Sequence, residues 1–438
     1  MMSARGLVAL PGKLIAQGNV LFRDPRKFIE NISQNLYPEQ YRERLIGLER
    51  MLTIHVRIDL QSAGPPHLNV LLPGLDRASL TGGPNTAINI AYRLAEMGVP
   101  IRLLCVDEGL STDTDRLWQH VLSVAGASER LANIQFASTF DPARPVAIGS
   151  RDVFLATYWT TAYRLKTLLP AMDVRSFIYL IQDFEPAFHP WSSAYAQALE
   201  TYGYQFRALI NEQLLADALC ASGAGRFAAP EFIEQCAVFE PAVDRSLFYP
   251  VAATGAQKRL LFYARPTQPR NLFGIGFEAL RLASRHPLFS GGNWTFVSIG
   301  GGRALGPMDL GEGRSLEPAP WLNYGSYGKL MRETDILLCL MLSPHTSYPV
   351  LEMSACRGTV VTNSFMTKTR DRLEAISPKI IVKPPAIEAI AEGLIMAAER
   401  VTGEIGDSPD LTLPGEWRLA LAATTLKAHQ MFIEFSLL

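Results

Sequence analysis

The sequence predicts an α/β protein built from two doubly wound parallel sheets, and three observations support this prediction. Short apolar runs that end in polar or glycine-containing loops alternate with stretches of helical periodicity. The alternation occurs twice, before and after a proline-bounded linker at residues 241–250. With 438 residues, 48% of them apolar, the chain has enough material for two hydrophobic cores.

The first series of elements begins with the apolar run at 67–73, which Pro73 and Gly74 stop, as is typical of a buried parallel strand. A helix is expected over 85–97. Further strands are expected at 100–106, 152–157, 176–181, 207–211 and 216–221.

The second series repeats this pattern after residue 258. Its strands are expected at 259–263, 294–299, 336–341, 359–362 and 379–383. Its helices are expected at 272–284, 326–332, 349–356 and 386–401, with a last helical stretch at 414–435.

The chain therefore divides into four parts. A helical extension covers 1–65, and within it residues 26–52 carry apolar side chains three and four positions apart, which also fits an amphipathic interface helix. The first α/β domain covers 66–245 and the second covers 246–411. A C-terminal helix at 412–438 could pack back on the first domain.

The composition limits which partners and which cellular compartment are compatible with the sequence. A formal net charge of −1 argues against nucleic acid as a partner. Five scattered cysteines fit a reducing compartment and form no metal-binding pattern. We expect neither a signal peptide nor an apolar run of the ~18–20 residues that a membrane span needs. The sequence thus predicts a cytoplasmic protein, and docking on the inner face of a membrane stays compatible with it.

Open α/β sheets bind ligands at the carboxyl ends of their strands, and three segments occupy such positions. The first is the pair Gly82 and Gly83 before the helix at 85–97, where the backbone could approach an anion. The alternative is an ordinary tight turn capped by Asn85 or Thr86.

The second segment is the loop after the strand at 259–263. Arg265 and Arg270 are five positions apart in it, and both guanidiniums could reach one diphosphate, with Asn271 beside them. The alternative is a pair of solvated loop arginines.

The third segment runs from the strand at 336–341 into a helix that begins near Pro349. The backbone N–H groups around Tyr348, Val350 and Leu351 could meet a phosphate, and Ser347 is a further candidate of the donor site. Glu352 could accept hydrogen bonds from sugar hydroxyls. Glu352 could equally act as a partner of the helix dipole.

A fourth group of residues suits a sugar acceptor. Asp183 and Glu185 follow the strand at 176–181 and would share one face of an extended segment, with His189 as a further donor. Tyr158 and Trp159 end another strand and could stack on a sugar ring, although core packing explains them equally well. The alternative for 182–189 is a polar loop anchored by its phenylalanines.

One apparent metal motif is interpreted differently. Asp113 and Asp115 form an Asp-x-Asp pattern, but they stand at an expected helix start, where aspartate acts as a cap. We therefore expect no metal ion and no other cofactor.

The order of these segments resembles the GT-B glycosyltransferases of family 4. In that family a Gly-Gly turn, an Arg-x4-Lys pair and an E-x7-E segment recur, and they match Gly82–Gly83, Arg265 with Arg270, and Glu352. The resemblance implies that the two arginines hold the diphosphate and that Glu352 holds the nucleotide ribose. The first glutamate of E-x7-E is absent, since Pro344 occupies its position. His345 beside it, or Ser347, could substitute for that glutamate.

The segments Tyr-Leu-Ile-Gln-Asp-Phe-Glu-Pro (179–186), Tyr-Ala-Arg-Pro (263–266) and Ser-Pro-His-Thr-Ser-Tyr-Pro-Val-Leu-Glu (343–352) resemble WsaF-like bacterial rhamnosyltransferases more closely. This resemblance implies transfer of a hexose, L-rhamnose from dTDP-L-rhamnose, to a surface polysaccharide or other glycan acceptor, without a metal and with retention. Arg265 and Arg270 would stabilise the leaving diphosphate, and Asp183 is the candidate base. Two alternatives remain: a nucleotide-sugar epimerase, and a non-catalytic GT-B scaffold.

Overall fold

The computed structural model describes residues 53–60, 64–75, 82–111, 113–251, 257–291, 293–301, 306–402 and 411–437. The helices expected at 26–52 lie outside these residues. The end of the segment expected to be a helical extension is not helical, because β1 (Val56–Asp59) pairs in parallel with β5 (Val146–Gly149). The alternating exposure of the residues in β1 fits a short strand with one solvated face.

The first large sheet has seven parallel strands. Their order across the sheet is β4 (Ile134–Ser138), β3 (Ile101–Cys105), β2 (Leu68–Leu72), β6 (Val153–Ala156), β7 (Phe177–Ile181), β8 (Phe206–Asn211) and β9 (Ala237–Phe239). The direction of winding reverses between β2 and β6, so this is a doubly wound sheet with its switch point there.

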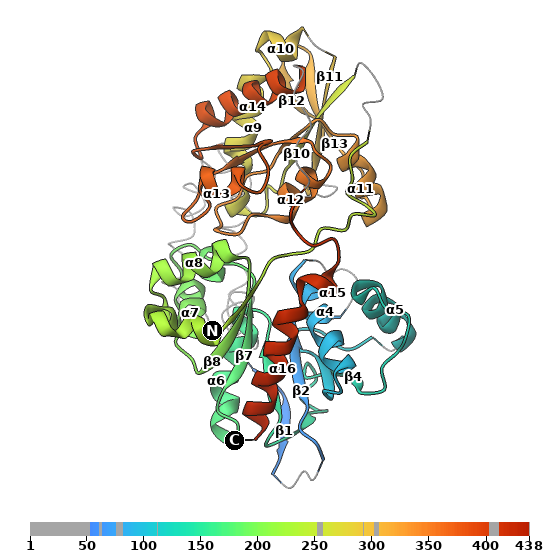
Figure 1. Cartoon of the computed structure of the whole chain (residues 1–438), viewed down its shortest axis with the longest axis vertical. Helices are drawn as coiled ribbons and strands as arrows, with labels where there is room; N and C mark the ends of the chain where they lie inside the picture. Colours follow the sequence, from blue (N-terminus) through green and yellow to red (C-terminus); the bar gives the residue numbers. More distant parts are fainter. Residues whose placement is uncertain are drawn as a thin grey trace, which may run out of the picture. The chain divides into compact units, whose positions relative to one another are not determined.

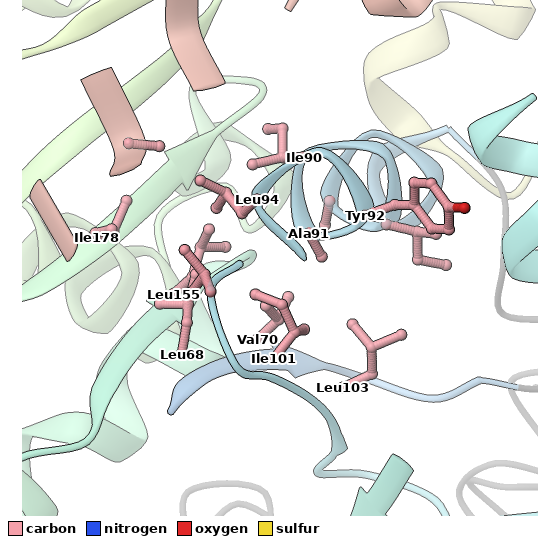
Figure 2. Close-up of a cluster of buried hydrophobic side chains, with 14 of the residues drawn as sticks. Leu68, Val70, Ile90, Ala91, Tyr92, Leu94, Ile101, Leu103, Leu155 and Ile178 are labelled. Atoms are coloured by element: carbon pink, nitrogen blue, oxygen red, sulfur yellow. The ribbon is translucent and has the colours of Figure 1, made fainter. Parts of the chain in front are cut away.

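One face of this sheet is covered by α4 (Gly83–Glu96), α5 (Thr114–Ala125) and α16 (Ala422–Ser436), whose apolar side chains join one core with β2, β3 and β6. Figure 2 shows Ala91 and Leu94 of α4 close to Val70 and Leu155 of the strands. The C-terminal helix α16 contacts α4, β7 and β9, so the end of the chain completes the core of the first sheet (Figure 1).

The other helices of the first domain are α6 (Trp159–Leu168), α7 (Ser193–Thr201) and α8 (Gln213–Ser222). The strand expected at 216–221 was wrong, because these residues belong to α8. The run is rich in alanine and leucine and has no β-branched residue, so helix propensity decides its structure once the segment is buried. Strands β4 and β9 were not predicted.

The second large sheet has the order β12 (Met308–Gly311), β13 (Arg314–Pro318), β11 (Trp294–Ile299), β10 (Lys258–Tyr263), β14 (Ile336–Leu338), β15 (Thr359–Asn363) and β16 (Ile380–Lys383). All neighbours are parallel except β12 and β13, which form a hairpin that the sequence did not predict. Gly311 and Gly313 take positive φ in its turn. The winding reverses between β10 and β14.

Both faces of the second sheet are covered, as the two cores show. Leu260 and Phe262 point into one core with α9 (Phe273–Ala283) and α14 (Ile387–Thr402), while Leu261 points into the other. That other core also contains residues of α11 (Tyr324–Arg332), α12 (Tyr348–Ala355) and α13 (Arg370–Glu374). A short helix, α10 (Pro287–Ser290), precedes β11, and 3-10 turns occur at Leu169–Ala171, Glu185–Phe188, Gly225–Ala228, Pro230–Gln235 and Pro269–Asn271.

The chain passes between the domains twice, and the two passages touch. Val243 in the expected linker donates its backbone N–H to the carbonyl of Pro414 at 2.9 Å, and Arg245 donates to the carbonyl of Leu411. The second passage leads through α15 (Trp417–Ala420) into α16. Within the described residues, no helix combines the length and the apolar character that crossing a bilayer requires.

Candidate active site

A cavity of about 620 Å³ lies where strands of both sheets end. In the first sheet its walls come from the segments after β2, β6, β7 and β8, and in the second from those after β10 and β14. Both switch points, β2/β6 and β10/β14, therefore open into the same cavity. This is the position at which doubly wound sheets bind ligands.

Gly82 and Gly83 line this cavity at the start of α4. Gly82 has a φ of 49°, a conformation that strains other residues, and it is the N-cap, so neither Asn85 nor Thr86 plays that part. A Cβ on Gly83 would lie 3.0 Å from Nε2 of Gln182, which donates to the Gly83 carbonyl. The glycines thus let the helix start approach the cavity closely.

Arg270 and Asp183 form an ion pair that joins the two domains. Nη1 of Arg270 lies 2.5 Å from Oδ2 of Asp183, and the guanidinium carbon lies 3.9 Å from the ring centre of Phe188. The other carboxylate oxygen, Oδ1, accepts hydrogen bonds from the Ser343 hydroxyl and the Phe184 N–H. Both oxygens of Asp183 are therefore occupied.

Arg265 lines the cavity as a half-exposed side chain, and in the described part of the chain no carboxylate pairs with it. Gly300, with a φ of 86°, gives it room, because a Cβ there would lie 3.0 Å from Cγ of Arg265. Asn271 also lines the cavity, but its amide nitrogen donates to the carbonyl of Leu340. Arg265 is thus the cation available to a ligand, and Asn271 supports the loop.

The helix start after β14 contributes Ser347, Tyr348 and Glu352 to the cavity wall. Val350 was wrongly expected to contact the donor: its side chain is buried in the core and its N–H donates to the Ser347 carbonyl. It follows Pro349 in the first turn, where the helical rotation points it toward the sheet.

Glu352 is buried at the cavity wall, and Oε2 accepts a hydrogen bond of 2.6 Å from the Tyr327 hydroxyl. Burial raises the pKa of Glu352 to about 7, an effect that the Tyr327 hydrogen bond opposes. Its ionisation is therefore sensitive to what fills the cavity.

His345, beside the position of the missing family glutamate, is held by the first domain. Its Nε2 lies 2.9 Å from Oε1 of Glu212, and its Nδ1 accepts the Ser347 N–H at 2.9 Å. Glu212 also accepts the N–H of Thr346. Since both ring nitrogens are engaged, His345 is not free to replace the missing glutamate at a sugar hydroxyl.

Two residues where the Glu212 segment contacts the His345 segment have strained backbones. Glu212 has a φ of 76° and Ser347 a φ of 83°, although neither is a glycine. Such conformations cost about 1–3 kcal/mol each and persist where the surroundings enforce them. The cost is concentrated where the two domains meet at the cavity.

The residues expected to bind the acceptor separate into two groups. Asp183 and Glu185 line the cavity, and Oε2 of Glu185 accepts the Trp159 N–H at 2.6 Å. Burial raises the pKa of Glu185 well above its usual value. Trp159 and His189 are not in the cavity lining, and the indole N–H of Trp159 donates to Nε2 of His189 at 3.1 Å. Tyr158, the neighbour of Trp159, lines the cavity.

Several cavity residues were not identified from the sequence. They include Thr157, Asn211 and Tyr327. The first two are the last residues of the strands expected at 152–157 and 207–211, so they could have been found by listing every polar side chain at the carboxyl end of a predicted strand. Tyr327 lies in the middle of α11, where only the packing of the helix reveals its role.

Asp113 caps α5 by accepting the Arg116 N–H at 3.0 Å, as the helix-start interpretation expected. Over the residues that the structure covers, no group of three or more His, Cys, Asp and Glu side chains is placed to hold a metal ion.

Solved structures share this architecture. Sucrose-phosphate synthase from Thermosynechococcus elongatus superposes with a TM-score of 0.53 at 10% identity, over 85% of this chain and 100% of that chain. Anabaena HepE, solved with UDP-glucose, superposes with a TM-score of 0.51 at 12% identity, over 84% and 98%. At these identities the likeness shows a common fold.

The two Rossmann-like sheets, with a shared cavity at their strand ends, have the GT-B fold. The chain belongs to the WsaF family: the model of the WsaF N-terminal domain matches residues 67–212 and that of the WsaF C-terminal domain matches 258–395.

A curated relative is the O-antigen biosynthesis protein RfbC of Myxococcus xanthus. It is 35% identical over 219 residues, which amount to 48% of this chain and 15% of that protein. This chain therefore spans only a small part of the length of that relative.

Proposed function

We propose that this protein transfers L-rhamnose from dTDP-L-rhamnose to a growing bacterial surface polysaccharide, without a metal ion and with retention of anomeric configuration. The observation that carries the proposal is the meeting of Arg265, Arg270 and the starts of α4 and α12 in one cavity. Membership of the WsaF family and the name of the Myxococcus relative support the polysaccharide context.

The main barrier to this reaction is charge separation. As the bond between the sugar carbon and the diphosphate oxygen breaks, its electron pair leaves with the diphosphate and positive character develops on the sugar. Arg265 has no acidic partner among the described residues, and Arg270 keeps further guanidinium donors beyond the one given to Asp183. Each such preorganised donor contributes about a hundredfold or more to the rate.

We propose that Asp183 positions Arg270 rather than acting as the base. Both of its oxygens accept hydrogen bonds, so neither is free to take a proton from an acceptor hydroxyl. In a retaining transfer, the departing phosphate oxygen lies on the same face as the incoming hydroxyl and can accept that proton. The acceptor oxygen then bonds to the sugar carbon, and the proton leaves with dTDP.

The synthesis of a nucleotide-sugar donor and the transfer of its sugar to a polysaccharide both take place in the compartment that contains the nucleotides. We therefore place the reaction in the cytoplasm, with docking at the inner face of the membrane where the acceptor is lipid-linked. Nucleic acid has no part in this proposal.

A two-stage experiment tests the proposal. Thermal shifts with dTDP, UDP and GDP identify the nucleotide, since a ligand at 100 times its dissociation constant adds about 2.7 kcal/mol of stability. Incubation with dTDP-L-rhamnose and rhamnose-containing oligosaccharides should then release dTDP and extend the glycan, and NMR of the new anomeric proton reports the configuration. A new nucleotide sugar formed without acceptor would instead identify an epimerase, and binding without turnover a non-catalytic scaffold.

A further inference from the structure

Glu185 is a buried carboxyl group in the cavity wall that has no cationic partner. It belongs to the first domain, where it begins the 3-10 turn Glu185–Phe188 after β7, and only 3% of its surface is exposed. Within the described residues its carboxyl takes part in no ion pair, and the guanidinium of Arg270 is paired with Asp183 instead. A buried carboxyl without a counter-ion is more stable with its proton than without it.

The charged and titratable groups that face Glu185 favour the same neutral form. Burial raises the pKa of Glu185 well above its usual value, and the Asp183 carboxylate adds to this rise. The charge of Arg270 and two hydrogen bonds to the carboxyl oppose the rise without cancelling it. Burial also raises the pKa values of the Tyr158 and Tyr202 hydroxyls nearby, so both stay neutral.

The hydrogen bonds of the carboxyl determine which oxygen carries the proton. Oε2 accepts the backbone N–H of Trp159 at 2.6 Å, and the Tyr179 hydroxyl lies 3.3 Å from the same oxygen. Oε1 has no hydrogen-bond partner in the described part of the chain, yet it is not fully buried, so it is open to the cavity. Since Oε2 already accepts hydrogen bonds, the proton lies on Oε1, and Glu185 presents an O–H donor to the cavity.

The position of this donor favours an uncharged oxygen as its partner. In the proposed reaction the diphosphate lies at Arg265 and Arg270 of the second domain, whereas Glu185 belongs to the facing domain. The carboxylate of Asp183, two residues before Glu185, repels an anion at this wall. The hydroxyl that attacks is not the partner, because a hydrogen bond donated to its oxygen would make it a weaker nucleophile. A neighbouring oxygen of the acceptor sugar meets both conditions.

Resting on the proposed sugar transfer, we propose that Glu185 is an acceptor-binding residue that acts as a neutral acid, donating its Oε1 proton in a hydrogen bond to a sugar oxygen next to the reacting hydroxyl. Asp183 and Glu185 thus have separate roles although they are two positions apart. Asp183 is an anion that orients Arg270, and Glu185 is an uncharged donor that orients the acceptor.

Two substitutions separate a neutral donor from a carboxylate. Transfer from dTDP-L-rhamnose to a rhamnose-containing oligosaccharide gives KM for both substrates. Glu185→Ala should raise KM for the oligosaccharide about tenfold, the effect of one lost hydrogen bond. Glu185→Gln should raise it about threefold or less, because the amide oxygen can accept the Trp159 N–H while the amide nitrogen donates to the cavity. KM for dTDP-L-rhamnose should change less than about twofold in both variants.

The pH dependence is a second measurement, which a purely structural role of Glu185 would not affect. The ratio of kcat/KM for the oligosaccharide between the wild type and Glu185→Gln should be constant from about pH 5 to 7. It should fall at higher pH, where Glu185 loses its proton and glutamine keeps its donor. Glu388→Gln is the control, because Glu388 is an exposed glutamate of α14 outside the cavity lining, and its ratio should not vary with pH.

The outcomes are distinct. An oligosaccharide KM that is unchanged in Glu185→Ala, or raised equally by both substitutions, would overturn the role of Glu185 and leave sugar transfer in place. A ratio that rises between about pH 5 and 7 would do the same, since it would show an ionised carboxylate at work. If Glu185→Ala does not bind dTDP like the wild type, Glu185→Gln and its pH dependence provide the test. Absence of transfer by the wild type would contradict the proposed function itself.

Discussion

Oδ2 of Asp183 lies 2.5 Å from Nη1 of Arg270, although 87 positions separate the two residues in the sequence. Asp183 follows β7 of the first sheet, and Arg270 belongs to the loop after β10 of the second. Arg270 in the cavity wall is therefore oriented by the domain that faces it, and the first two predictions concern this pair.

Replacing Arg270 by alanine should lower kcat about a hundredfold or more, because a preorganised charge on the leaving diphosphate is lost. The circular dichroism spectrum should stay close to that of the wild type, since the side chain lies at a cavity wall, whereas the melting temperature should fall because Asp183 loses its cation. Arg285→Ala is the control, because Arg285 is an exposed arginine remote from the cavity lining. Near-normal turnover in Arg270→Ala would remove the residue from the site.

Asp183→Asn should lower kcat/KM by about tenfold, the effect of weakening one charge-assisted hydrogen bond. If Asp183 acts only through Arg270, Asp183→Asn should lower kcat/KM little further when Arg270 is already replaced by alanine. A double-mutant cycle measures this coupling. The pH dependence of kcat should keep its wild-type shape. Loss of the acidic limb of that profile in Asp183→Asn would instead identify a base.

The stability of the protein should depend on the ionisation of Glu352. Burial raises its pKa from the usual 4.5 to about 7, so the folded state keeps a proton that the unfolded chain has released. Stability is therefore lost as the pH rises from 4.5 to 7 and then levels off, with a total cost of up to about 3 kcal/mol.

Urea unfolding of the wild type and Glu352→Gln between pH 5 and 8 measures this cost, because the other titrating groups cancel in the difference. The advantage of Glu352→Gln should grow with pH over this range. A constant difference between the two proteins would show that Glu352 ionises as an ordinary carboxyl.

Gly276 should tolerate no side chain. A Cβ there would lie 2.5 Å from Cζ of the fully buried Phe262, so Gly276→Ala should destabilise the protein by about 1–3 kcal/mol. Gly274, two residues earlier in α9, has no atom within 4 Å of such a Cβ. Gly274→Ala should leave stability unchanged or raise it by up to about 1 kcal/mol.

Chemical denaturation of the two glycine variants provides this comparison. Equal effects would mean that α9 moves away from β10 at little cost, contrary to the packing in the structure.

Much of the fold follows from local pattern. Buried parallel strands are nearly continuous apolar runs, so 67–73, 176–181 and 259–263 could be recognised, and the loops after them located the glycine pair and the arginines. The prediction failed at 216–221, because a short, mostly apolar run interrupted by Asp217 has no periodicity that distinguishes a strand from a buried helix. Edge strands such as β9, with only three residues, leave even less signal.

The sequence by itself determined which residue types stand at the strand ends: glycines at a helix start, two arginines in one loop, and a glutamate in a helix. Only the tertiary structure decided their partners, namely Asp183 on Arg270, Tyr327 on Glu352 and Glu212 on His345. The reason is physical. Periodicity reflects burial against the nearest sheet, whereas these contacts span 87, 25 and 133 positions and exist only where packed elements and two domains meet.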